Sequence, residues 1–560
     1  MNRLSSFLTS PLSWLGLLVL LVLALLAMPL RLPIGPNYWD LYTYVDTAYR
    51  IKLGQIPHLD FFIPVGALGY GLYILVTKLF PAAHTLLAVH YAILIVALPV
   101  MALIVTQAQK RSRIEAMALV LPFMLFALVP INSLELYPSP GFDGYGNYNR
   151  HAALLLYILA ANVLFVGNRH LAALIGVALL VMLFFIKITG FAVGSLLFLH
   201  ALLTRRIALR SSALALASVS MILLWLEWQP GLITAYIVDI ITLVSLNSGS
   251  LLPRILTVLS VKFDVIAAAV ALIMLLIWQS RYSLLEKLRS VLAARSFASV
   301  TALLDTTPVW LASLLLLGSI FETQNTGSHE FILLWPAILL LLRDHPLPWQ
   351  RRDALVLGLV AMTVLPTPIG IAHRAIRAMA SAPTYEAVNV PLLGPVGRVS
   401  AKADIMRQSR AMLAHYPTAR TAYENMAQRG VLPSYILFSE IDFQVSWLIA
   451  IEEAAEALLA YEKENKRRFA RIVTLDFVDP LPVILERQPL KDLSIGNDPT
   501  RTLATIGARV IAEIASADAI LLPLCPVTEA RNAIANAYAP SLSGRRLVNL
   551  TPCYMMLVKE

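Results

Sequence analysis

Long apolar stretches separated by short polar segments fill the first two thirds of the chain. A hydrocarbon core about 30 Å thick requires about 20 apolar residues per helix. The first stretch is too long for a signal-peptide core, lacks a cleavage site and precedes many others, so we interpret it as an anchor. The pattern predicts a polytopic α-helical membrane protein with about eleven transmembrane helices, at 12–30, 85–107, 115–131, 151–167, 171–188, 190–203, 212–229, 255–278, 308–322, 330–343 and 354–372.

Basic residues predict the orientation of these spans. Because short cytoplasmic loops are rich in Lys and Arg, the side that carries Arg3 is predicted to be cytoplasmic, together with the connections 109–113, 167–170, 204–210, 281–295 and 343–353. The outer face then receives the loops 31–84, 132–150, 230–253 and 323–329. Segment 63–80 is apolar, but counting it as a span would reverse every later basic loop. We therefore expect it to lie in the outer interface.

The last third of the chain has the composition of a soluble domain. Residues 373–560 contain 21 basic and 19 acidic residues, against 23 and 15 in residues 1–372. Apolar runs at 434–438, 470–477, 518–524 and 545–551 are typical of strands, and 446–468 and 500–515 have helical periodicity. We expect a transmembrane module over 1–372 and an α/β domain over 373–560 on the outer face.

Composition supports this organisation. Hydrophobic residues make up 58% of the chain and the mean hydropathy is +0.72, which excludes an ordinary soluble protein. The net charge of +10 lies mainly in the predicted cytoplasmic loops, so no nucleic-acid partner is expected. The two cysteines, Cys525 and Cys553, lie in the outer domain. A disulfide and a pair of buried free thiols are both compatible with that location.

The first outer loop holds the leading candidate for chemistry. Asp40 precedes a helix-like stretch that ends before Gly54 and Pro57. It could act as an acid or base, or only favour the helix N-terminus. Asp46 and Arg50 are spaced i,i+4, which also suits a local ion pair, and Asp60 could hold the loop.

Further candidates lie in later outer segments. The second outer loop offers the acids Glu135 and Asp143 for a metal or a substrate hydroxyl, followed by Arg150. Lys187 interrupts an apolar run. A charge in a membrane segment suggests a functional site, although a lysine near a helix end can also extend to the interface. His329 follows the ninth span, where the spacing of Glu and His is not specific for a metal site.

A family resemblance emerges from the run Asp40, Tyr44, Ala48, Arg50, Gly54, Pro57, Asp60–Phe61, Pro64, Gly66, Leu68 and Tyr70. This run and the predicted topology resemble the GT-C glycosyltransferases, which include protein O-mannosyltransferases and the aminoarabinose transferase of lipid A. The resemblance implies that Asp40 takes the place of the catalytic first-loop acid and that Asp143, or else Glu135, takes the place of the second-loop acid. The chain departs from the family pattern because Leu41 follows Asp40 where the family has a second acid, and because the second outer loop lacks a D-x-D motif. The dependence on a divalent metal such as Mg²⁺ or Mn²⁺ therefore stays open.

The resemblance also implies a reaction and its partners. A polyprenyl-phosphate-linked sugar is the expected donor, and a cell-envelope glycan, lipid or protein is the expected acceptor. Asp40 would be the general base of an inverting transfer. Arg50, Asp60, Glu135, Arg150, Lys187 and His329 would bind substrate, with the basic ones stabilising the departing phosphate. Asp40, Asp143 and Glu135 are the ligands expected for any metal. We expect a bacterial inner-membrane location.

Two alternatives from other classes remain at this stage. A transporter or lipid flippase would place polar residues near the bilayer midplane, where this chain has few acids. A non-catalytic envelope assembly protein would use the first-loop acids only for structure.

Overall fold

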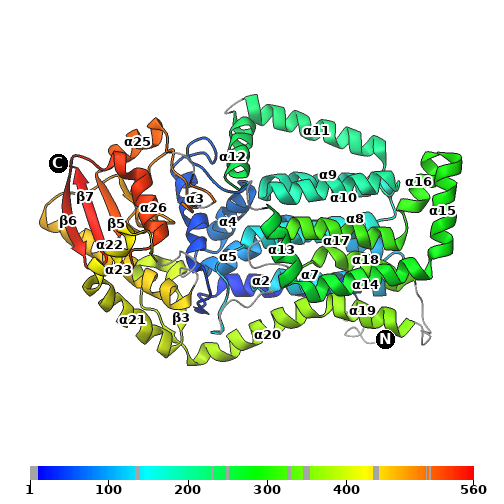
Figure 1. Ribbon diagram of the computed structural model, residues 1–560, viewed down its shortest axis with the longest axis horizontal. Coiled ribbons are helices and arrows are strands. Elements are labelled where there is room, and N and C mark those ends of the chain that lie inside the picture. Colours follow the sequence, from blue (N-terminus) through cyan, green and yellow to red (C-terminus); the bar gives the residue numbers. More distant parts are fainter. Residues whose placement is uncertain are drawn as a thin grey trace.

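The computed structural model describes residues 10–132, 139–228, 231–247, 251–324, 330–344, 353–432, 440–499, 501–503 and 506–559. A bundle of helices forms one half of the molecule and a domain that contains the larger sheet forms the other half (Figure 1). Helices α3 (Leu41–Lys52) and α4 (Leu68–Leu79) of the first outer loop lie between the two halves.

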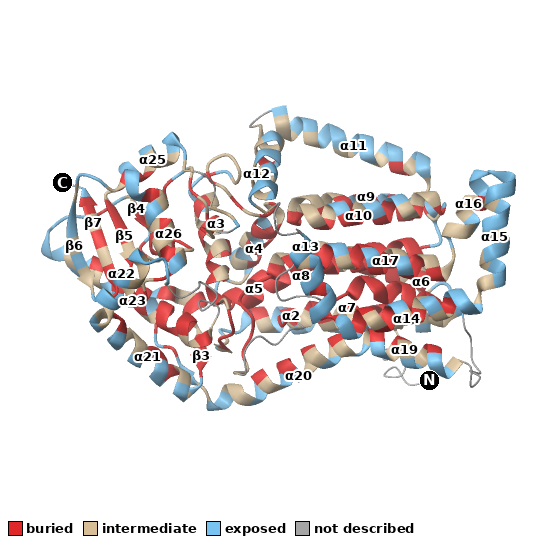
Figure 2. Cartoon of the chain, viewed as in Figure 1, coloured by how far each residue is buried: buried red, intermediate tan, exposed pale blue. Residues whose placement is uncertain are grey.

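Apolar sequences form the helices of the bundle. The central helix α8 is buried along almost its whole length, whereas α11 exposes most of its apolar side chains (Figure 2). The described helices are α2 (Pro11–Ala27), α5 (Thr85–Ala92), α6 (Leu94–Ala108), α7 (Arg113–Leu128), α8 (Asn147–Phe165), α9 (Arg169–Ile186), α10 (Ile188–Leu203), α11 (Leu209–Trp228), α12 (Leu232–Asn247), α13 (Leu251–Val261), α14 (Phe263–Gln279), α15 (Arg281–Ala294), α16 (Phe297–Leu304), α17 (Thr307–Glu322), α18 (Trp335–Asp344), α19 (Asp353–Val364) and α20 (Pro366–Ser381).

Length and apolar composition support a polytopic helical membrane protein. Within the described ranges, three helical segments are long and apolar enough to cross a membrane, and this becomes seven if each bent pair is one span. The exposed apolar side chains of α11 have the character expected of a surface that faces lipid. The number of eleven transmembrane spans stays a prediction.

Two predictions about the middle of the bundle are wrong. The predicted outer loop 230–253 contains the helix α12, and the predicted span 255–278 is divided between α13 and α14. In the structure most of the predicted loop, Leu232–Asn247, is helical. The Asp239 carboxylate of this helix lies 2.7 Å from a ring nitrogen of His58.

Several other helices are shorter or more bent than predicted. The predicted span 354–372 is divided between α19 and α20, which bend by 43°, and Pro366 and Pro368 explain the break because proline cannot continue the hydrogen bonds of a preceding helix. Within segment 63–80 the helix α4 has 12 residues, about 18 Å at 1.5 Å per residue. This length is too short to cross a bilayer and agrees with an interfacial position.

The basic connections gather at one end of the bundle. Arg111, Arg169, Arg205 and Arg343 line the same cavity there. Helices α15 and α16 mark this end in Figure 1, far from the sheet of the C-terminal domain. Four of the basic connections therefore meet at one end of the bundle. That the basic connections share one side of the membrane, and that this side is cytoplasmic, stay predictions.

The C-terminal domain is built on a four-stranded sheet in the order β4-β5-β7-β6, with β4 parallel to β5 and the other pairs antiparallel. Alternate side chains pack on opposite faces. Val473 and Ile520 pack with α25 and α26, whereas Leu521 and Met556 belong to the core that includes α23. The elements are α21 (Ala403–Thr418), α22 (Arg420–Gln428), α23 (Ile441–Glu464), β4 (Ile472–Thr474), α24 (Leu481–Ile484), α25 (Ala508–Ala515), β5 (Ala519–Pro523), α26 (Glu529–Tyr538), β6 (Arg545–Thr551) and β7 (Tyr554–Lys559).

The predicted elements of this domain are largely present. The runs 470–477, 518–524 and 545–551 contain β4, β5 and β6, and 446–468 coincides with most of α23. The predicted helix 500–515 forms only over α25, and the predicted strand 434–438 lies outside the described residues. The sequence analysis missed β7, which pairs with both β5 and β6.

A small second sheet joins the first outer loop to the C-terminal part of the chain. Strand β1 (Leu32–Pro33) pairs in parallel with β3 (Val399–Ala401), which also pairs with β2 (Glu386–Ala387). Helix α20 runs through the predicted domain boundary at residue 373 without interruption. The two halves are therefore connected by the continuous chain and by main-chain hydrogen bonds.

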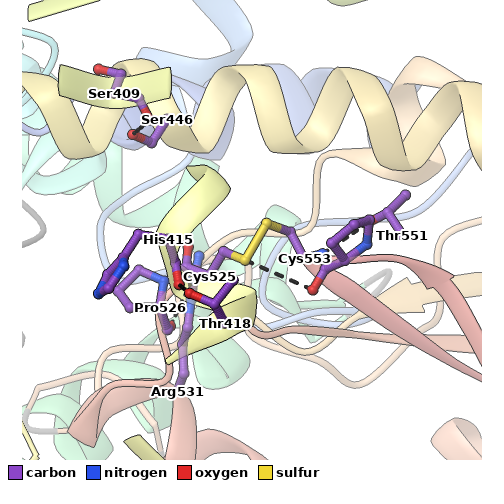
Figure 3. Close-up of a disulfide and its surroundings, with 10 residues drawn as sticks. Ser409, His415, Thr418, Ser446, Cys525, Pro526, Arg531, Thr551 and Cys553 are labelled. Carbon is purple, nitrogen blue, oxygen red and sulfur yellow. Dashed lines mark hydrogen bonds between the residues drawn. A yellow bond between two sulfur atoms is a disulfide. The ribbon is translucent and has the colours of Figure 1, made fainter. Parts of the chain in front are cut away.

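The Cys525–Cys553 disulfide is present, with Cα atoms 4.9 Å apart. It joins the segment after β5 to the turn between β6 and β7 (Figure 3). Arg531 donates to the Cys525 carbonyl at 2.9 Å and pairs with the Asp476 carboxylate at 2.8 Å. The disulfide alternative is confirmed over the free thiols, and it ties the sheet together beside a buried ion pair.

Replacing both cysteines with serine is expected to lower the free energy of unfolding by about 3.5 kcal/mol, because a cross-link at this spacing restricts the unfolded chain. Denaturant unfolding of the detergent-purified protein, followed by tryptophan fluorescence, measures the change. A reductant should destabilise the wild type and leave the double variant unchanged. Equal stability of the two proteins without reductant would contradict the prediction.

Candidate functional site

A cavity of about 440 Å³ lies where the bundle, the first outer loop and the C-terminal domain meet. The junction of α9 and α10 contributes Lys187, α13 contributes Arg254, and the C-terminal domain contributes Arg501. Asp239 is the one carboxylate among the described lining residues. The described lining therefore has three basic side chains and one acidic side chain.

One wall of the same cavity is apolar. Helix α12 contributes Ile240, Leu243 and Val244, and α13 contributes Val258. Helices α12 and α13 also expose large apolar side chains elsewhere on their surfaces. The cavity therefore combines cations with an apolar wall, an arrangement that suits an amphiphilic anion.

Lys187 is the predicted substrate-binding residue that the structure places on this cavity. Lys187 is 7% exposed. Its side-chain nitrogen donates to the Asn149 side-chain oxygen at 2.5 Å and to the Gln324 carbonyl at 2.7 Å. The ammonium also lies 5.6 Å from the ring centroids of Tyr148 and Phe321. Lys187 is thus held inside the protein and does not extend along the lipid surface.

The sequence analysis missed Arg254 and Arg501. Arg254 donates to the side-chain oxygens of Gln324 at 3.1 Å and Asn247 at 2.9 Å. The Asn247 amide also donates to the Arg501 carbonyl at 3.1 Å. Arg254 lies in an apolar stretch, the signal that identified Lys187, and could have been found in the same way. Arg501 has no local signal, because only the docking of the C-terminal domain brings it here.

Asp40 is not among the described residues that line this cavity, but it lies close enough to the lining residue Arg501 for the two charges to interact. It stands at the end of the short helix η1 (Tyr38–Asp40) and the start of α3. Its side chain makes no capping hydrogen bond to α3, so the purely structural interpretation as a cap is not supported. Burial, together with the negative charge of Asp498, raises the pKa of Asp40 to about 7, against the opposing effect of Arg501. A carboxyl group with this pKa can accept or release a proton near neutral pH.

The residues before Asp40 are fixed to the C-terminal domain. The Trp39 ring lies 4.7 Å from the Phe477 ring and 6.0 Å from the Trp447 ring, and its amide donates to the Gln444 side-chain oxygen at 2.8 Å. The Tyr38 hydroxyl donates to the Val396 carbonyl at 2.8 Å. These contacts hold the backbone that carries Asp40.

Arg50 and Asp60, two other candidates of the first outer loop, form contacts that hold the loop in place. Arg50 pairs with Asp46 at 2.9 Å and donates to the Leu490 carbonyl at 2.5 Å, fully inside the protein. Asp60 pairs with Lys491 at 2.9 Å. Neither Arg50 nor Asp60 is among the described residues that line the cavity, and their predicted roles in substrate binding stay predictions.

Asp143 and Arg150 lie in separate buried ion pairs. The Asp143 carboxylate pairs with Arg374 of α20 at 2.9 Å and accepts from the Asn132 amide at 2.8 Å. Arg150 pairs with Glu330 at 2.5 Å. Both pairs connect distant segments of the bundle. The predicted chemical roles of Asp143 and Arg150 stay predictions, and the contacts observed are structural.

The remaining candidates concern a metal site. Glu135 and His329 lie outside the described residues. In the described ranges, no group of three or more His, Cys, Asp or Glu side chains is arranged to hold a metal ion. Of the acids expected to bind a metal, Asp143 is engaged by a guanidinium group. Because Glu135 lies outside the described residues, the metal site that the sequence suggested stays a prediction.

Comparison with known proteins gives two similar solved structures. No family model and no curated protein matches the chain. Crystal structures of ArnT from Cupriavidus metallidurans cover 97% of this chain and 97% of their own. The apo state has a TM-score of 0.37 at 15% identity, and the state bound to undecaprenyl phosphate has a TM-score of 0.41 at 14% identity. ArnT is an aminoarabinose transferase of the GT-C group, the group that the first outer loop resembles. Neither likeness by itself assigns a function to this chain.

Replacing Arg374 with Met is expected to destabilise the protein by about 3–5 kcal/mol, because the Asp143 carboxylate would stay buried without its partner. The double variant D143N/R374M should recover part of this loss, since it removes both charges. Thermal unfolding of the purified proteins measures both effects, with H373Q on the exposed side of the same helix as control. A stable R374M protein would show that the pair does not hold α20.

Proposed function

We propose that this protein is a membrane glycosyltransferase that moves a sugar from a polyprenyl-phosphate donor to a cell-envelope acceptor. The observation that carries the proposal is the position of Asp40, a carboxyl group with a pKa of about 7, beside a cavity lined by Lys187, Arg254 and Arg501. The resemblance of residues 40–70 to GT-C enzymes supports the same assignment.

The cavity suits the phosphate end of a lipid-linked sugar. Its three cations can stabilise the negative charge that grows on the phosphate as the sugar leaves, and its apolar wall from α12 and α13 suits the first units of the prenyl chain. A soluble sugar nucleotide has no apolar chain that could pack against this wall. The donor is therefore assigned to the lipid-phosphate class.

Asp40 is proposed as the general base. Its carboxylate accepts the proton of the acceptor hydroxyl while that oxygen forms a bond to the anomeric carbon of the sugar. The bond between this carbon and the phosphate oxygen breaks, and the lipid phosphate leaves with the electron pair. A single displacement of this kind inverts the anomeric configuration.

The C-terminal domain is proposed to complete the site. It contributes Arg501 to the cavity and Asp498 to the electrostatic surroundings of Asp40. Its position beside α3 and α4 also suits binding of the acceptor close to Asp40. By the positive-inside pattern, this half of the molecule lies on the outer face of the bacterial inner membrane.

Changing Asp40 to Asn is expected to abolish sugar transfer, because an amide cannot accept the proton. Mass spectrometry of envelope glycans and glycolipids from a deletion strain and from the wild type identifies the product that depends on this protein. The D40N gene should then fail to restore that product at normal membrane abundance. Restoration by D40N would refute the assignment of the base.

The pH dependence gives an independent test with a matched variant. Because the base must be deprotonated, the rate of the purified enzyme should rise with pH around the Asp40 pKa of about 7 and then level off. Changing Asp498 to Asn removes a negative charge that raises this pKa, so the rising part of the profile should move to lower pH. An unchanged profile in D498N would contradict the coupling of these two carboxyl groups.

Changing Lys187 to Met is expected to weaken the binding of undecaprenyl phosphate to the purified protein by about tenfold or more, because a charge-assisted hydrogen bond contributes about 1.5–3 kcal/mol. Titration followed by intrinsic fluorescence measures the affinity. K262M is a matched control, since Lys262 lies at the start of α14 and is not among the described lining residues. Equal loss in both variants would argue against a phosphate site at Lys187.

A further inference from the structure

A second cationic cavity, of about 280 Å³, lies at the opposite end of the bundle. One carboxylate, that of Asp305, is present among the described residues that line it. The proposed transfer reaction does not use this cavity, which is separated from Asp40 by the length of the bundle helices. Five guanidinium groups surround it, those of Arg111, Arg169, Arg205, Arg206 and Arg343.

The five arginines come from different parts of the chain. Arg111 follows α6, Arg169 starts α9, Arg205 and Arg206 follow α10, and Arg343 is near the end of α18. The tertiary structure thus brings four separate segments to one point. Convergence of like charges is unfavourable unless counter-charges are present.

The counter-charges provided by the protein are few. Asp305 pairs with Arg206 at 2.6 Å, and Arg343 pairs with Asp344 at 3.1 Å. Over the part of the chain that the structure describes, Arg111, Arg169 and Arg205 are found in no ion pair. The cavity therefore holds more cations than its carboxylates neutralise.

The membrane orientation alone does not explain this arrangement. A preference for basic residues on one side of the membrane is satisfied equally by arginines that do not converge on a cavity, such as Arg210 and Arg281, which are not among the described lining residues. Arg206 is additionally held in place, since its guanidinium lies 5.3 Å from the centroid of the Trp310 ring and donates to the Leu164 carbonyl at 3.3 Å. The site is thus built partly from fixed groups.

We propose that this cavity binds a phosphate-bearing anion. The planar guanidinium group presents paired N–H donors that match phosphate oxygens, and basic pockets between helices on this side of membrane proteins bind phospholipid head groups. The ligand is a phosphate group, either on an anionic phospholipid of the surrounding leaflet or free in solution. Binding would neutralise the arginines and connect the ends of α6, α9, α10 and α18.

The test uses full-length protein in a zwitterionic detergent and two probes, dihexanoyl phosphatidylglycerol and inorganic phosphate, titrated at constant ionic strength. Saturable binding is expected, and the R169Q/R205Q variant should bind about tenfold or more weakly because it loses two charge-assisted contacts. The matched control R210Q/R281Q removes two arginines that do not line the cavity. It should bind like the wild type.

A conservative variant covers the case in which R169Q/R205Q does not fold. R169K/R205K keeps both charges and loses the paired donors, so it should fold and bind with intermediate affinity. Melting temperatures without probe verify folding of every variant. Wild-type affinity in both cavity variants, or equal loss in R210Q/R281Q, would overturn the proposal.

The two probes distinguish the source of the phosphate. Binding of phosphatidylglycerol that inorganic phosphate cannot displace assigns the site to a lipid head group. Displacement by inorganic phosphate assigns it to a free anion. If neither probe binds saturably, or if dihexanoyl phosphatidylcholine binds as well as phosphatidylglycerol, the proposal is wrong.

Discussion

The arrangement of the site depends on the packing of the first outer loop against the C-terminal domain. Trp39 inserts between Phe443, Trp447 and Phe477, and aromatic contacts of this kind bury a large apolar area with defined geometry. The next residue is Asp40, so the same packing holds the proposed base. It also brings Asp498 and Arg501 close enough to influence the Asp40 pKa. The electrostatic properties of the site are therefore a consequence of hydrophobic docking.

Buried charges have two distinct uses in this molecule. The pairs Asp143–Arg374 and Arg150–Glu330 connect segments far apart in sequence, and the loss of one partner would leave a costly uncompensated charge. Lys187, in contrast, is held by an amide oxygen and a carbonyl on the wall of a cavity. Both uses place a charged residue next to apolar sequence, and of these five residues Lys187 is the one that lines the cavity of about 440 Å³.

The two cationic cavities lie at opposite ends of the helical bundle and differ in their surroundings. The cavity beside Asp40 has an apolar wall and contributions from the C-terminal domain. The cavity at the other end is formed by the basic connections between helices and by Asp305. A phosphate at the first would take part in sugar transfer, whereas a phosphate at the second would stabilise the packing of helix ends. In the two proposals, the same charge chemistry would serve reaction in one place and anchoring in the other.

Hydrophobic periodicity by itself determined the helical bundle and most strands of the C-terminal sheet, because these features depend on local composition. The sequence also identified Asp40, Lys187 and the two cysteines from their local surroundings. Only the tertiary structure showed that Leu232–Asn247 forms the helix α12 and that its Asp239 meets His58, a residue far away in the sequence. It likewise decided which partners Arg50 and Asp60 contact and that Arg254 and Arg501 face the cavity, because the partners of a charged side chain are set by segments that lie far away in the sequence.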